Sequence, residues 1–139
     1  MRGHRFFDHT GDFGADLEAD SEAGLYEASV DALVGLLVDD VAAIREAESR
    51  ALEVRGVDPE DQLVALGNEV LFLFETGWLA RRVEVEELDE DALRLVAHGE
   101  PFEADRHVIA RPIKAVTHHG ARVEERADGT WVGRLIFDL

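Results

Sequence analysis

Residues 58–98 read DPEDQLVALGNEVLFLFETGWLARRVEVEELDEDALRLVAH, and within them the spacing of apolar residues changes from a helical to a strand period. Asp58 and Pro59 are typical of a helix N-terminus, and the leucine-rich run after them repeats every three to four residues as far as Gly77. Residues 80–88 and 92–98 then alternate between apolar and polar side chains, which predicts a β-hairpin. A helix followed by an antiparallel hairpin indicates an α+β fold.

The segments on either side extend this pattern. A first helix is predicted at residues 21–38, with one apolar stripe at three- to four-residue spacing. Further strands are predicted at residues 6–9, 15–19, 46–55, 108–118, 122–126 and 130–138. Pro112 restricts its strand to an edge or a bulge, and Asp128-Gly129 is a strong hairpin turn. We therefore expect two helices packed on a mixed or antiparallel β-sheet, built from strand-helix-strand-strand modules.

Length and composition indicate one globular domain, expected to span residues 1–139. Hydrophobic residues make up 46% of the chain, enough to form a core and to argue against disorder. No apolar run approaches the roughly 20 residues that cross a bilayer, and the polar N-terminus does not resemble a signal peptide. The absence of cysteine excludes disulfides and thiolate chemistry. We expect a soluble cytoplasmic domain that does not associate with membranes.

The charge balance is strongly acidic. Thirty-one Asp and Glu residues stand against 14 Lys and Arg residues, for a formal net charge of −17. Because nucleic-acid binding depends on neutralising phosphates, no direct nucleic-acid binding is expected. An acidic surface favours cations and basic protein partners, although solvation alone accounts for most of these carboxylates.

Two aspartates and the last residue are candidate metal ligands. Asp12 lies in the glycine-punctuated turn 11–14, and Asp138 ends the last predicted strand beside the Leu139 carboxylate. If the first and last strands are neighbours, these three groups meet, and three charged oxygen donors suit a hard cation such as Ca²⁺, Mg²⁺ or Mn²⁺. Isolated aspartates in glycine-rich turns and at strand ends are common, so spacing alone favours an ordinary turn and strand end over a metal site.

Four histidines are further candidates for metal ligation or general-base catalysis: His9, His107, His118 and His119. None has the spacing of a metal motif, and packing or hydrogen-bonding roles are more common for such residues. Gly99-Glu100-Pro101 and residues 105–107 could also form a polar patch with Lys114. Since the chain lacks a phosphate loop and a serine elbow, no catalytic residue is assigned.

Three segments together resemble the archease family. FDHTGDFG at residues 7–14 is similar to the family's D-H-T-A-D-x-G signature. Residues 99–119, with their GEP, a histidine and KAVTHH, are similar to its G-E…H…K-A-V-T-Y-H segment, and FDL at residues 137–139 to its closing hydrophobic-Asp-hydrophobic tripeptide. Gly11 and His118 depart from the family's usual alanine and tyrosine.

The resemblance implies a compact α+β fold and a metal site at Asp12, Asp138 and Leu139. It also implies a protein cofactor, not an enzyme. Archeases promote guanylylation and repeated turnover of the RtcB-type RNA ligase, which uses GTP and Mn²⁺ in tRNA splicing. Two other classes stay open: a small metal-dependent nucleotide phosphohydrolase, and a metal-independent chaperone or scaffold.

Overall fold

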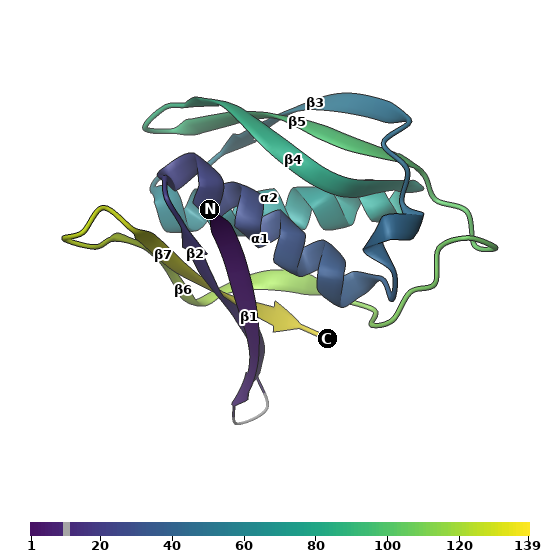
Figure 1. The fold of residues 1–139 in the computed structure, drawn as a ribbon, viewed down its shortest axis with the longest axis horizontal. Coiled ribbons are helices and arrows are strands. Elements are labelled where there is room, and N and C mark those ends of the chain that lie inside the picture. The colour runs from purple at the N-terminus through teal and green to yellow at the C-terminus, as the bar shows by residue number, and fades with distance from the viewer. Residues whose placement is uncertain (10–11) are drawn as a thin grey trace.

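The computed structural model describes residues 1–9 and 12–139, and in it two helices lie between two antiparallel sheets (Figure 1). The lower sheet has the strand order β1 (Arg2–His9), β2 (Asp12–Ala19), β7 (Trp131–Asp138) and β6 (Ala115–Glu125). The upper sheet has the order β3 (Glu48–Arg55), β5 (Ala92–Pro101) and β4 (Trp78–Leu88). The middle layer consists of α1 (Glu22–Leu37) and α2 (Pro59–Glu75), and a short 3₁₀ helix, η1 (Val41–Ala43), follows α1.

The helix boundaries follow local capping chemistry. Ser21 Oγ accepts a hydrogen bond from Gly24 N at 3.0 Å, and Asp58 Oδ1 accepts one from Asp61 N at 2.8 Å. Pro59 occupies the first turn of α2, where a missing N–H costs nothing. Gly77, which follows the end of α2, has φ of +99°, a conformation that favours glycine. The predicted start and end of the second helix are confirmed.

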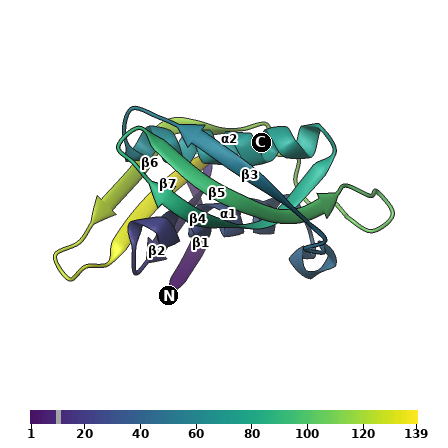
Figure 2. The same cartoon turned by 90° about the horizontal axis from the view of Figure 1, so that it is seen from above.

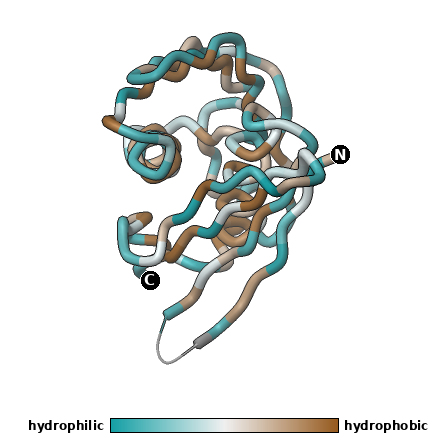
Figure 3. The backbone as a smooth tube through the Cα atoms, turned by 90° about the vertical axis from the view of Figure 1, so that its left-hand side faces the viewer, coloured by the Kyte–Doolittle hydropathy of each residue, from teal (hydrophilic) through white to brown (hydrophobic). Residues whose placement is uncertain are grey.

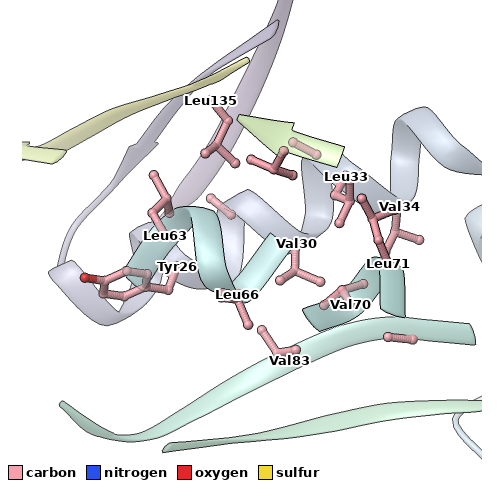
Figure 4. Close-up of a cluster of buried hydrophobic side chains, with 14 of the residues drawn as sticks. Tyr26, Val30, Leu33, Val34, Leu63, Leu66, Val70, Leu71, Val83 and Leu135 are labelled. Carbon is pink, nitrogen blue, oxygen red and sulfur yellow. The ribbon is translucent and has the colours of Figure 1, made fainter. Parts of the chain in front are cut away.

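The core lies between the layers. Tyr26 and Leu33 of α1 and Leu66 of α2 are fully buried, and they converge with side chains from both sheets (Figure 4). The most hydrophobic stretches of the chain accordingly lie toward the middle of the molecule (Figure 3). Burial of one such leucine contributes about 2 kcal/mol. Among the described residues, no helix is long and apolar enough to span a membrane.

The first strand does not contact the last, because β2 lies between β1 and β7. Asp12 begins β2, so the contact that the metal hypothesis requires comes from the second strand. β2 pairs with β7 antiparallel, with Phe13 opposite Phe137 and Gly14 opposite Ile136. A Cβ on Gly14 would lie 2.5 Å from the Leu135 carbonyl oxygen and 2.5 Å from the Phe7 ring, so only glycine fits this crossing. The strand pair thus brings the start of β2 and the C-terminal end of β7 to one end of the lower sheet.

The α+β class and the antiparallel pairing are confirmed, with two refinements. The strands form two sheets with the helices between them (Figure 1), and the view from above shows β3, β5 and β4 lying over the helices (Figure 2). The predicted strand at 108–118 is wrong for its first half, because β6 begins only at Ala115. Residues 102–114 form an irregular connection whose one isolated bridge among the described residues joins Val38 to Ile109. Pro112 lacks the N–H that a strand ladder needs there.

Candidate metal centre

Asp12 and Asp138 occupy matching ends of two paired strands. Asp12 is the first residue of β2, and Asp138 is the last residue of β7. Both lie one step beyond the Phe13–Phe137 pair, so the register of the two strands sets them opposite each other. Directly opposed residues in an antiparallel pair have Cβ atoms about 5 Å apart, close enough for both carboxylates to reach one ion.

A pocket of about 320 Å³ forms at this end of the strand pair. Asp12, Asp138 and Leu139 all line it, together with Phe13, Thr117, His119, Ile136 and Phe137. The three residues singled out from the sequence therefore share one pocket, although they come from opposite ends of the chain. The Asp12 side chain is 47% exposed, so the pocket opens to solvent.

The position of Asp138 is fixed by β6 as well as by β2. Ala115 pairs with Asp138 across the β6–β7 ladder, and Lys114 N donates a hydrogen bond to the Asp138 carbonyl at 2.8 Å. These contacts hold the main chain of β7 up to Asp138, its last residue. The carboxylates at this end therefore project from a fixed backbone.

β6 contributes two further polar groups to the pocket. The ladder with β7 is irregular between Thr117 and Arg122, and Gly120 there has φ of +70°. His119, within this irregularity, places its Nε2 4.0 Å from Asp12 Oδ2. The Thr117 hydroxyl is buried and has no hydrogen-bond partner in the part of the chain that the structure describes.

His118 points away from the pocket, as expected for adjacent residues of a strand. Its Nε2 lies 2.8 Å from Asp61 Oδ1 at the start of α2, and this hydrogen bond lowers the pKa of the Asp61 carboxyl. Of this histidine pair, His119 alone therefore lies at the candidate site. Thr10, Gly11 and the side chain of His9 lie outside the described residues.

The donor set of the pocket fits a hard cation. Among residues 1–9 and 12–139, no group of three His, Cys, Asp or Glu side chains is placed to hold a metal ion. A metal centre here would therefore combine the Asp12 and Asp138 side chains with the Leu139 carboxylate. The unpartnered Thr117 hydroxyl is a fourth oxygen in the same pocket. Oxygen donors of this kind suit Ca²⁺, Mg²⁺ or Mn²⁺.

The second polar cluster suggested by the sequence is a buried network around Glu100. Arg106 donates two hydrogen bonds to its carboxylate, at 2.7 and 2.9 Å, and Arg45 N donates a third at 2.7 Å. His107 Nε2 lies 2.9 Å from the same carboxylate. Chiefly through the Arg106 hydrogen bonds, the pKa of Glu100 is held well below its usual range. Lys114 is not among these partners, so the expected patch forms without it.

The Glu100 network is structural in character. Glu100 is 4% exposed and His107 is 3% exposed, so neither is accessible to a substrate. Arg106 also donates to the Ala43 carbonyl at 3.2 Å, which joins the connection 102–114 to η1. His107 Nδ1 accepts a hydrogen bond from Glu103 N at 2.9 Å, which leaves its Nε2 as the donor to Glu100.

Comparison with known proteins gives matches over nearly the whole chain. Residues 4–139 match the model of the Archease protein family (MTH1598/TM1083). The chain is 31% identical to Protein archease of Pyrococcus furiosus over 143 aligned positions that cover all of both chains. It is 35% identical to Protein archease of Methanopyrus kandleri, over 95% of this chain and 96% of the relative.

Two solved structures have the same fold. The solution structure of protein 1598 of Methanobacterium thermoautotrophicum superposes with a TM-score of 0.80 at 27% identity, over 99% of each chain. A crystal structure from Thermotoga maritima, described as an archease and possible chaperone, gives a TM-score of 0.63 at 19% identity, over 96% of this chain and 94% of that one.

Proposed function

This chain belongs to the archease family, and we propose that it is a cytoplasmic accessory protein that activates an RtcB-type RNA ligase. In this role it carries a divalent cation and promotes guanylylation and repeated turnover of the ligase in tRNA splicing and RNA repair. The Thermotoga maritima relative is described as a possible chaperone, which agrees with action on a protein partner.

One observation carries the proposal: the pocket at the β2–β7 end collects carboxylates from both ends of the chain. Isolated carboxylates on an acidic protein need no special explanation. Asp12, Asp138 and Leu139 line one pocket, and a bound cation would offset the repulsion between carboxylates that reach into it.

Asp12, Asp138 and Leu139 would hold the cation through their carboxylate oxygens, and Thr117 would add its hydroxyl. When bound, the cation supplies Lewis-acid stabilisation of charge on phosphate oxygens. The strand pairing fixes the backbone of Asp12 and Asp138, so the donors need little reorganisation. Because the pocket opens to solvent, part of the coordination sphere stays accessible to a partner.

The charge of the chain supports a basic partner surface. A net charge of −17 favours association with a positively charged protein and speeds it at low ionic strength. A protein that binds RNA presents such a surface, and an acidic cofactor approaches it without competing for free RNA.

The test is a ligase guanylylation assay with Asp12→Asn and Asp138→Asn proteins. Both changes keep the side-chain shape and remove one charge, so we expect folded proteins that no longer stimulate the ligase. Asp39→Asn, at an exposed residue near the end of α1, removes the same charge elsewhere and should stimulate fully. Full stimulation by both pocket variants would contradict the metal role and favour a metal-independent chaperone or scaffold. Nucleotide hydrolysis by the isolated protein with Mn²⁺ would favour the phosphohydrolase instead.

A further inference from the structure

A row of arginines crosses the outer face of the lower sheet. Arg5 of β1 pairs with Asp16 of β2, Asp16 with Arg134 of β7, and Arg134 with Arg122 of β6. Residues paired directly across strands share one face of a sheet, so these side chains stand side by side. The opposite face carries Leu17 and packs on α1, which leaves the arginine row on the solvent side.

The row lies within a pocket of about 620 Å³. Five of the chain's 13 arginines line this basic pocket, against two carboxylates, Asp16 and Glu18. The lining side chains therefore carry a formal charge of +3 on a chain whose net charge is −17. The basic pocket is a local reversal of the charge of the whole molecule.

Arg134 is the fixed member of the row. It donates to both Asp16 oxygens, at 2.8 and 3.2 Å, and its guanidinium lies 4.5 Å from the centre of the Phe7 ring. Hydrogen bonding to Asp16 raises the pKa of Arg134, so the group stays charged. One carboxylate and one aromatic ring thus orient a guanidinium at the centre of the basic pocket.

Three of the surrounding arginines use few of their N–H donors within the described residues. Arg5 reaches Asp16 only at 3.7 Å and is 84% exposed, and Arg122 reaches Glu124 only at 3.6 Å. Within the described residues, the Arg126 guanidinium makes no hydrogen bond or ion pair. The fifth arginine, Arg2, is instead bound to acidic residues of α1. The guanidinium groups of Arg5, Arg122 and Arg126 are therefore available beside that of Arg134. Such a group of arginines is suited to a ligand with several anionic oxygens.

We propose that the basic pocket binds a compact oligophosphate, such as the di- or triphosphate group of a nucleotide. The row crosses three strand spacings, about 14 Å between its outermost backbones, and long arginine side chains from both ends can converge on a short chain of phosphates. The volume of 620 Å³ lies in the range of small-molecule sites. A long polyanion is disfavoured, because beyond this pocket it meets an acidic surface.

This site is separate from the candidate metal centre. Asp12 and Asp138 lie four residues along β2 and β7 from Asp16 and Arg134, a distance of about 13 Å. The two pockets have no lining residue in common. Oligophosphate binding and metal binding can therefore be tested separately.

The experiment is calorimetric titration of the protein with inorganic tripolyphosphate, without divalent metal and at low ionic strength. We expect one site whose affinity falls as salt is added. Arg122→Gln combined with Arg126→Gln should weaken binding at least about tenfold, through loss of charge-assisted hydrogen bonds. Arg55→Gln combined with Arg94→Gln makes the same charge change on exposed residues of the upper sheet and should leave the affinity within about twofold.

Asp16→Asn provides a test that a folding defect cannot imitate. It releases donors of Arg5 and Arg134 and removes a repelling charge, so tripolyphosphate should bind several-fold more tightly. Absence of binding at millimolar tripolyphosphate, or equal losses in both double variants, would overturn the proposal. Tighter binding of a 20-nucleotide single-stranded RNA than of tripolyphosphate would also overturn it, in favour of an extended phosphate backbone.

Discussion

Replacing Glu100 by glutamine should destabilise the fold by about 3 kcal/mol. The change keeps the size of the side chain but removes the charge that Arg106, His107 and Arg45 N surround. It also places the glutamine NH₂ group, which is itself a hydrogen-bond donor, against the N–H donors of Arg106 and Arg45. Breaking a buried charged pair costs about 3–5 kcal/mol, and we take the lower end because Arg106 is 25% exposed and regains water. For a chain of this size, the melting temperature should fall by roughly 10 °C.

Urea denaturation of the wild-type and Glu100→Gln proteins measures this difference directly. Glu103→Gln is the matched control, because Glu103 contacts the same Arg106 at 3.2 Å but is 53% exposed. That exposed pair should contribute no more than about 0.5 kcal/mol. A loss below about 1 kcal/mol for Glu100→Gln, or equal losses for the two variants, would refute the view that this network fixes the connection 102–114.

The Glu100 contribution should also depend on pH in one direction. The pKa of Glu100 is lower in the folded chain than the unfolded value of about 4.3, so the stabilisation is fully present above that value. It is lost as the pH falls toward the folded pKa. The difference in stability between the wild type and Glu100→Gln should therefore stay constant from pH 7 to about 5 and narrow below about pH 4. A difference that widened in acid would contradict the assignment.

Three further changes test the packing that places the candidate sites. Gly14→Ala sets a methyl group 2.5 Å from the Leu135 carbonyl, so it should cost at least about 2 kcal/mol and separate β2 from β7, measured by urea denaturation and amide exchange. The Asn68 side chain accepts a hydrogen bond from Val116 N at 2.9 Å and donates one to Val116 O at 3.0 Å. Asn68→Ala should therefore lower the free energy of unfolding by about 2–3 kcal/mol in the same assay. A decrease of less than about 0.5 kcal/mol would mean that water replaces both hydrogen bonds. Asp58→Ala removes the N-cap of α2 and should cost about 1 kcal/mol, while Asp58→Asn should be nearly neutral.

Local chemistry made much of the fold predictable from the sequence. The cap at Asp58 and Pro59 depends only on neighbours along the chain, and so does the alternation that forms β4 and β5. The proximity of Asp12 and Asp138 was expected on the condition that the first and last strands pair; β1 and β7 do not, but Asp12 begins β2, which does pair with β7. The family resemblance independently pointed to the same residues.

Features set by distant contacts were not predictable. Alternation of apolar and polar residues identifies a strand but not the strand that it pairs with. The division into two sheets could therefore not be predicted from local sequence. Residues 108–114 have strand-like composition, yet the Glu100 network and Pro112 hold them in an irregular path. The arginine row was also missed, because Arg5, Arg122 and Arg134 align only once the registers of four strands are known. In one sequence, arginines spread this far apart look like ordinary surface charge.

Proton NMR of the isotopically labelled protein during titration with Mn²⁺ shows whether the pocket at Asp12 and Asp138 binds a divalent cation, because the paramagnetic ion broadens nearby amide signals. We expect one tight site, with broadening centred on Phe13, His119 and Leu139, and we expect that broadening to be lost in Asp138→Asn. Weak broadening centred on acidic stretches elsewhere, such as residues 86–91, would contradict it. In that case Asp12 and Asp138 would lie at the ends of two paired strands without forming a metal site.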